Sequence, residues 1–104
     1  MSEFTHVSVA KEANVSFDGQ VISRTIMFAD GTKKALGVML PGEYEFGTEV
    51  QELMEISSGA MDVLLPEASD WVSITGGMSF EVSANAKFGV KVHEITNYCC
   101  SYFA

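Results

Sequence analysis

The sequence predicts an all-β domain, either a sandwich or a barrel built from short strands. Apolar residues recur at every second position through most of the 104-residue chain, as they do in strands that bury one face. Asp-Gly, Pro-Gly and Gly-Gly pairs interrupt this pattern at short intervals. The length suits one domain, and an apolar content of 47% is enough for a core. We therefore expect a single domain over residues 1–104, with a flexible N-terminal segment at residues 1–10.

The expected strands follow one another along the chain, and a turn signal separates most neighbours. Many short strands joined by close turns are typical of sandwiches and barrels. The turn signals are Asp18-Gly19, Asp30-Gly31, Pro41-Gly42, Gly59, Pro66, Gly76-Gly77 and Ala84-Asn85. The expected strands cover residues 15–17, 20–28, 33–40, 43–47, 51–57, 60–65, 71–75, 79–83, 87–93 and 97–103.

The clearest local prediction is a hairpin around the sequence FADGTK. Asp30-Gly31 is a strong two-residue turn signal because both residue types accept positive φ angles. Such a turn sets Arg24 opposite Gly37, on the more apolar face of its strand. Two interpretations of Arg24 stay open. Its side chain extends to solvent at the end of a sheet, or it lines a pocket above the glycine and binds an anion or a carboxylate.

The charge balance excludes some classes of partner. The net charge is −8, from 14 acidic and 6 basic residues, which opposes nucleic-acid binding because phosphate contacts need clustered Lys and Arg. No apolar run approaches the roughly 20 residues of a membrane helix. The start of the chain lacks the apolar segment of a signal peptide. We expect a cytoplasmic protein with no nucleic-acid and no membrane partner.

The two cysteines, Cys99 and Cys100, are adjacent in the sequence. Neighbouring residues of a strand point to opposite faces, so a disulfide between them is not expected. Two histidines far from these cysteines do not complete a zinc signature. We therefore expect two reduced, partly buried thiols.

Glutamates in the middle of the chain follow the spacing of a known metal motif. The cupin barrels carry Gly, five residues, His-x-His, a short gap, Glu, six residues and Gly. In this chain Gly37 is followed by five residues and by Glu43-Tyr44-Glu45, and Glu52 is followed by six residues and Gly59. The pattern resembles a cupin motif in which glutamates stand where histidines would bind metal. Phe88 stands at the last ligand position of the second cupin motif.

A narrower resemblance covers about residues 11–103. The segments GVMLPGEYEFGT and ISSGAMDVLLPEASDW are similar to those of the pyrimidine/purine nucleoside phosphorylase family. The resemblance implies a metal-free, single-domain cupin-like β-barrel of the jelly-roll type, assembled as a homodimer. It also implies a pentosyltransferase that converts a nucleoside and phosphate to a free base and a pentose 1-phosphate, with broad base tolerance. Nucleosides and inorganic phosphate would be its substrates, and no cofactor would be needed.

The residues themselves leave one metal alternative open. Transition metals prefer imidazole or thiolate ligands, and the motif offers neither. Carboxylates gathered on one face of a barrel could instead hold Ca²⁺, Mg²⁺ or Mn²⁺. We expect no metal, because Phe88 fills one ligand position and the resembled family is metal-free.

Phosphorolysis sets out what a site must contain. The site must bind phosphate, bind and orient the ribose, and stabilise an oxocarbenium-like transition state. Arg24, the only arginine, is the expected phosphate ligand, and Glu43 and Glu52 are the expected ribose or base partners. The alternative for both glutamates is a solvated strand end. Phe88 is expected to face the lumen, where stacking on its ring would tolerate different bases. The remaining substrate-binding candidates are Glu45, Ser83, Asn85 and Tyr98.

Other functions compete with this one. A cupin that binds a nucleoside or sugar without catalysis would keep the pocket and Arg24 but show no turnover. A sugar isomerase or epimerase would need a His or Tyr acid/base pair in the lumen, and no convincing pair is found. A structural dimer with a filled barrel is the remaining alternative.

Overall fold

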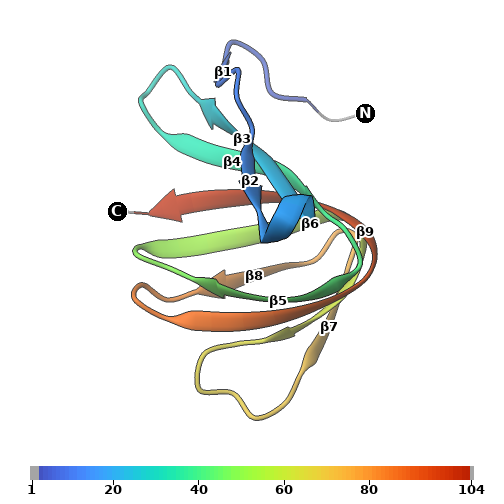
Figure 1. Ribbon diagram of the computed structural model, residues 1–104. Coiled ribbons are helices and arrows are strands. Elements are labelled where there is room, and N and C mark those ends of the chain that lie inside the picture. Colours follow the sequence, from blue (N-terminus) through green and yellow to red (C-terminus); the bar gives the residue numbers. More distant parts are fainter. Residues whose placement is uncertain (1–2, 104) are drawn as a thin grey trace.

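The structure, a computed structural model, describes residues 3–103 and consists almost entirely of β-strands (Figure 1). The prediction of an all-β chain is confirmed. A short 3₁₀ helix, η1 (Phe17–Gly19), lies between the second and third strands. The strands are β1 (Ser8–Val9), β2 (Asn14–Ser16), β3 (Val21–Met27), β4 (Lys33–Met39), β5 (Gly42–Gly47), β6 (Gln51–Leu64), β7 (Val72–Thr75), β8 (Ser79–Val82) and β9 (Lys87–Phe103).

Two long strands, β6 and β9, form the spine of the sheet. The order is β1-β3-β4-β9-β6-β7, and β2, β5 and β8 pair with β3, β9 and β6 respectively. Every pairing among residues 3–103 is antiparallel. β9 pairs with β5 through its first half and with β4 through its second. The curved strands wrap one interior while β1 and β7 remain the two ends of the hydrogen-bonded path (Figure 1).

The long strands are bent where the sequence pattern indicated separate strands. The expected strands 51–57 and 60–65 are one strand, β6, and 87–93 and 97–103 are one strand, β9. The register between them shifts around Gly59, whose φ of 113° is accessible to glycine. A side chain at this position would collide with Thr96. A β-bulge bends a strand and increases its twist without ending it, so the glycine marks a bend and not a boundary.

The β3–β4 hairpin has a different register from the one expected. The backbone N–H of Gly31 donates to the carbonyl oxygen of Phe28 (3.0 Å), and Gly31 alone in this loop has a positive φ, 88°. A three-residue loop of this kind is a turn followed by a left-handed residue, whereas a two-residue turn requires two positive φ angles. The expected pair of Arg24 and Gly37 was therefore wrong by one residue: Arg24 lies opposite Leu36.

The core fills the space inside the curved sheet. Phe88, Val90 and Val92 of β9 are buried at alternate positions, whereas Lys91 points to the outer face, because successive side chains of a strand point to opposite faces. Adjacent Cys99 and Cys100 are both free, which confirms the prediction of reduced thiols. The core cluster contains Val21, Ala35, Met39, Tyr44, Met54, Ile56, Met61, Val63, Ile74, Phe80, Val82, Phe88, Val90, Val92, Tyr98 and Cys100.

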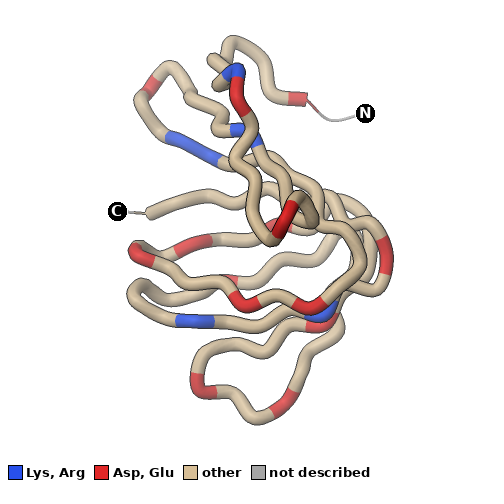
Figure 2. The backbone as a smooth tube through the Cα atoms, viewed as in Figure 1, with Lys and Arg blue, Asp and Glu red and all other residues tan. Residues whose placement is uncertain are grey.

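Charged residues lie mainly on the outside of this core. Basic positions lie around β3, β4 and the segment before them and also on β9, whereas acidic positions are distributed over the whole chain trace (Figure 2). No helix in the described part of the chain is long and apolar enough to cross a membrane.

Candidate functional site

A cavity of about 260 Å³ opens inside the sheet, where β2, β3, β4, β5, β6 and β9 contribute lining residues. Three residues expected from the sequence, Glu52, Phe88 and Tyr98, line it. The complete lining is Asn14, Ser16, Val21, Ser23, Met39, Phe46, Gly47, Glu52, Met54, Phe88, Tyr98, Cys100 and Tyr102.

Glu52 is the charged residue of this lining. It lies near the start of β6, opposite Tyr102 of β9 on one side and Val82 of β8 on the other. The thiol of Cys100 donates a hydrogen bond to Oε1 of Glu52, with Sγ and Oε1 3.3 Å apart. Burial raises the pKa of the Glu52 carboxyl, and the hydrogen bond from Cys100 opposes part of this shift. The Glu52 carboxyl therefore holds its proton more readily than a fully solvated glutamate does.

Three neutral donors face Glu52 from alternate positions of β9. Tyr98, Cys100 and Tyr102 all line the cavity because successive side chains of a strand alternate between its faces. Tyr98 and Cys100 are buried, whereas Tyr102 is 45% exposed. Burial is the largest cause that raises the pKa of each of these groups. All three are therefore protonated near neutral pH and can donate hydrogen bonds to a ligand.

Aromatic rings form one end of the cavity. The ring of Phe88 is stacked against that of Phe46, with centroids 5.5 Å apart and planes inclined by 26°. Phe17 of η1 extends this group, at 5.3 Å from Phe46 and 4.9 Å from Tyr44. The expectation that Phe88 faces the lumen is confirmed, since its side chain is buried and lines the cavity. An apolar, flat wall of this kind favours a planar ligand group.

Arg24 lies on the opposite face of the sheet from this cavity. It is exposed, and it lines a second groove of about 440 Å³ together with Ile22, Leu36 and Asn97. Ser23 and Tyr98 line both this groove and the cavity. The one-residue difference in hairpin register is the reason, because it places Ser23 and not Arg24 opposite Gly37. The structure therefore does not bring the arginine and Glu52 together.

Glu43 and Glu45 also point away from the cavity. The inner face of β5 is taken by Tyr44 and Phe46, so the alternating glutamates project outward. The Glu43 side chain is 75% exposed, and its Oε1 lies 3.9 Å from Nζ of Lys91. Glu43 and Glu45, which were expected in the site together with Glu52, therefore lie outside the cavity that Glu52 lines.

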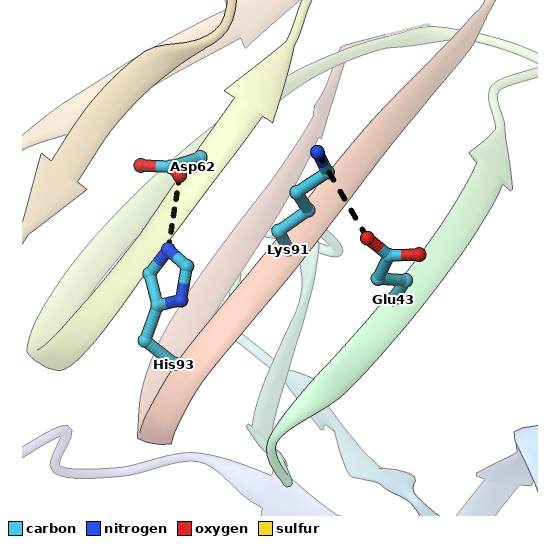
Figure 3. A network of polar contacts seen from close by, with 4 residues as sticks. All are labelled: Glu43, Asp62, Lys91 and His93. Carbon is cyan, nitrogen blue, oxygen red and sulfur yellow. Dashed lines mark hydrogen bonds and ion pairs between the residues drawn. The ribbon is translucent and has the colours of Figure 1, made fainter.

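The outer face beside β5 carries a small polar network (Figure 3). Lys91 lies between Glu43 and the ring of Trp71, with its Nζ 4.3 Å from the ring centroid. Nε2 of His93 contacts Oδ2 of Asp62 at 2.9 Å on the neighbouring strand β6. These contacts join β5, β9 and β6 on the surface, away from the cavity lining.

Ser83 and Asn85 belong to the turn that connects β8 and β9. Asn85 has a left-handed backbone, with φ of 53°, and both residues are exposed. The buried hydroxyl of Thr48 donates to the carbonyl oxygen of Ser83 (2.6 Å) and accepts from the backbone N–H of Ala86 (3.1 Å). Neither candidate lines the cavity, and the turn is instead held by the segment that follows β5.

A third hollow, of about 500 Å³, lies on the outer face beneath the N-terminal segment. Phe4 packs edge-on against Phe28, and Nζ of Lys34 lies 5.4 and 5.6 Å from the two ring centroids. Leu36 and Cys99 form part of its floor. This hollow and the groove beside Arg24 share Leu36, so the outer face is hollowed over a continuous area.

The sequence did not assign a role to Cys100. The signal that could have found it is the two-residue period of the last strand, which places its thiol between Tyr98 and Tyr102 on one face. Ser23 and Asn14, which also line the cavity, carry no recognisable signal because their positions depend on how β2 and β3 pair. Among residues 3–103, no three His, Cys, Asp or Glu side chains converge as metal ligands would.

Comparison with known proteins places this architecture in a family. The family model described as pyrimidine/purine nucleoside phosphorylase matches residues 11–102. A protein of that name from Geotalea uraniireducens is 60% identical over 98% of both chains, and one from Hydrogenovibrio crunogenus is 58% identical over 98% of both. The crystal structure of a protein of unknown function from Acinetobacter sp. ADP1 is 41% identical, with a TM-score of 0.95 over 97% of this chain and 98% of that one.

More distant structures show the fold alone. A cupin superfamily protein from Desulfitobacterium hafniense is 14% identical, with a TM-score of 0.65 over 89% of this chain and 84% of that one. The prediction of a cupin-like all-β fold is confirmed by this likeness and by the strand content.

Proposed function

We propose that this chain, which belongs to the pyrimidine/purine nucleoside phosphorylase family, catalyses the phosphorolysis of nucleosides. A purine or pyrimidine nucleoside and inorganic phosphate would give the free base and a pentose 1-phosphate. The enzyme would thus be a pentosyltransferase, a kind of glycosyltransferase, that needs no metal or organic cofactor. The family membership across nearly the whole chain is the observation that carries this proposal.

The cavity supports the proposal through its combination of groups. Glu52 would face the ribose or the base, and the hydroxyls of Tyr98 and Tyr102 would hold the ribose, since carboxyl groups and phenols bind sugar hydroxyls. The stacked rings of Phe46 and Phe88 would face the base. Aromatic stacking tolerates different bases because every base has a π-face, which would give broad base specificity.

Phosphate would enter the same cavity and meet neutral donors. The lining formed by described residues holds no Lys, Arg or His, so hydroxyl groups such as those of Ser23 and Tyr102 would contact the anion. Arg24, the phosphate ligand expected from the sequence, is not part of this lining, although its groove shares Ser23 and Tyr98 with the cavity. We therefore assign the reaction to cavity residues, and the phosphate Michaelis constant of an Arg24 variant tests this choice.

We also propose that the enzyme is a cytoplasmic homodimer. The outer face exposes Ile22, Leu36 and Met78, which are apolar side chains next to the hollows described above. Pairing two copies across a two-fold axis would bury this face. Light scattering after gel filtration should give twice the monomer mass of 11.3 kDa, and Leu36→Glu should shift the mass toward one chain.

The test of the reaction is direct. Purified protein with EDTA is incubated with uridine or adenosine, with and without phosphate, and free base and pentose 1-phosphate are quantified. Glu52→Gln, purified identically, controls for a contaminating host enzyme, and Glu81→Gln on the outer side of β8 is the matched surface variant. We expect phosphate-dependent release by the wild type and Glu81→Gln only. Equal release by Glu52→Gln, or no release from any nucleoside, would refute the proposal.

A binding protein without turnover is the second candidate. The observation that favours it is the lack of a cation in the described lining, because a phosphate dianion would have to approach Glu52 without a countercharge. In that case nucleosides or sugars would raise the melting temperature in proportion to the logarithm of their concentration, and no base would be released.

A further inference from the structure

The thiol of Cys100 lies where it influences which carboxyl oxygen of Glu52 carries the acid proton. Cys100 is buried, and its Sγ donates to Oε1 of Glu52 over 3.3 Å. An oxygen that accepts this hydrogen bond is a poor place for the acid proton, because the thiol hydrogen already occupies the space along its lone pair. When Glu52 is protonated, its hydrogen is therefore favoured on Oε2.

Few other groups compete for that proton. The titratable residues that face Glu52 are Tyr98, Cys100 and Tyr102, all from β9. The lining contributed by β2, β3, β4 and β5 is uncharged: it consists of Asn14, Ser16, Val21, Ser23, Met39, Phe46 and Gly47. The neighbour of Glu52 on β8 is Val82, which is apolar. Cys100 is thus the one side chain for which the structure gives a hydrogen bond to this carboxyl in the described chain.

From this geometry we infer that Cys100 is a positioning residue, which holds Glu52 so that Oε2 delivers a proton to the leaving base. This inference rests on the proposed phosphorolysis. The Glu52 carboxyl is the group that would make the base a good leaving group. A base departs from C1′ with the electron pair of the glycosidic bond and is more stable once a proton has reached its ring. A proton donor placed in this way typically contributes about 10²–10⁴-fold in rate.

The proton balance closes within the cavity. The glycosidic C1′–N bond breaks, a phosphate oxygen forms the new bond to C1′, and the Glu52 proton moves to the base. The ionised carboxyl then faces the positive charge that develops on the sugar ring and stabilises it. The proton carried by the attacking hydrogen phosphate returns to Glu52, so no further reactant is needed.

The first experiment compares Cys100→Ala, Cys100→Ser and Cys99→Ala in the full chain. Cys99 is the adjacent thiol on the outer face, so its variant controls for removing a cysteine from the same strand. We expect Cys100→Ala to lower kcat about 10-fold with little change in the nucleoside KM. Cys100→Ser, which keeps a donor, should recover much of this loss, and Cys99→Ala should behave as wild type.

The pH dependence of kcat distinguishes a positioning role of Cys100 from a purely structural one, because loss of stability alone would not shift the pH at which kcat falls. The acid form of Glu52 is the active form, so kcat should fall as pH rises through its pKa. The hydrogen bond from Cys100 favours the carboxylate, so its removal should move this fall to higher pH, and serine should move it back.

A substrate whose leaving group needs no proton tests the role of Glu52 itself. Glu52→Gln should lose far less activity toward a nitrophenyl riboside than toward uridine.

A second measurement is independent of turnover. The carboxyl resonance of Glu52 is titrated by NMR in protein labelled with ¹³C-glutamate, with Glu52→Gln for assignment. A higher pKa in Cys100→Ala than in wild type and Cys99→Ala supports the hydrogen bond even if no nucleoside is cleaved, which separates this inference from the proposed function. An unchanged pKa, an unchanged pH profile, or an equal loss with uridine and the nitrophenyl riboside would overturn it.

Discussion

The phenol ring of Tyr98 occupies the space that a side chain at Gly37 would need. The two residues are paired across β4 and β9, and a Cβ at position 37 would lie 2.6 Å from both Cζ and Oη of the tyrosine. It would also lie 2.7 Å from the carbonyl oxygen of Ile22. The ring therefore covers the backbone of β4 and forms one wall of the cavity. This is the space that the sequence had suggested for Arg24.

Replacement of Gly37 by alanine should damage both stability and the site. The new methyl group would displace the buried ring of Tyr98 and collide with the backbone carbonyl of Ile22, which cannot move as easily as a side chain. Overpacking of this kind costs about 1–3 kcal/mol in the free energy of unfolding, which urea titration would measure. Gly47→Ala is the control, because its nearest neighbour would be 3.9 Å away. Equal stability of the two variants would contradict the placement of Tyr98.

The carboxyl of Glu52 should make folding less favourable at neutral pH. Its pKa in the folded state is raised above the usual 4.5, so the folded protein binds this proton more tightly than the unfolded chain. The contribution of this group to stability is then fully present below pH 4.5 and is lost as pH rises through the folded-state pKa. Glu52→Gln should therefore raise the melting temperature at pH 7.5 and not at pH 4. Glu81→Gln corrects for losing one negative charge, and an equal gain from it would disprove the effect.

The hydroxyl of Thr48 should be needed to hold the turn between β8 and β9. Thr48→Val keeps the shape of the side chain but removes both the bond to the Ser83 carbonyl and the acceptor for the Ala86 N–H. Loss of buried hydrogen-bond partners costs about 1–3 kcal/mol, measurable by chemical unfolding. Thr75→Val, at an exposed hydroxyl 3.5 Å from Sδ of Met78, should cost clearly less. Hydrogen exchange at Ala86 should also accelerate, and an unchanged rate would argue against this contact.

The phosphate Michaelis constant of an Arg24 variant will show whether phosphate binds in the cavity or beside Arg24. Arg24 is exposed and is not part of the cavity lining, so we expect Arg24→Ala to leave the phosphate KM within about two-fold of wild type, because salt screens an exposed charge. A large rise in the phosphate KM with an unchanged nucleoside KM would instead support the phosphate role expected from the sequence. Initial rates at varied phosphate concentrations distinguish the two results.

Lys91 should contribute to stability through the ring of Trp71. Its ammonium lies 4.3 Å from the ring centroid and is also near Glu43, at 3.9 Å. A partly exposed cation–π contact contributes about 0.5–1 kcal/mol, so Lys91→Met should lower the free energy of unfolding by a similar amount. It should also change the fluorescence of the single tryptophan. Lys87→Met, on the same strand, should leave the fluorescence unchanged if the contact is correctly placed.

The local pattern of the chain determined much of the fold. Alternation along residues 87–93 was enough to bury Phe88, Val90 and Val92 and to expose Lys91, because the pleat of a strand fixes successive side-chain directions. The same rule separated Cys99 from Cys100. It also sufficed to place Tyr98 and Tyr102 on one face, next to what proved to be a cavity. The family could likewise be identified from the residues alone.

Only the tertiary structure decided which candidate groups meet. Glu43 and Glu45 matched a motif by spacing, but spacing does not show which face of β5 turns inward, and Tyr44 and Phe46 take that face because burying aromatic rings is more favourable than burying carboxylates. Arg24 was misplaced because one residue in a hairpin loop reverses every side chain relative to its partner strand. The contact between Glu52 and Cys100 joins residues 48 positions apart, and it depends on the pairing of β6 with β9, which no local pattern encodes.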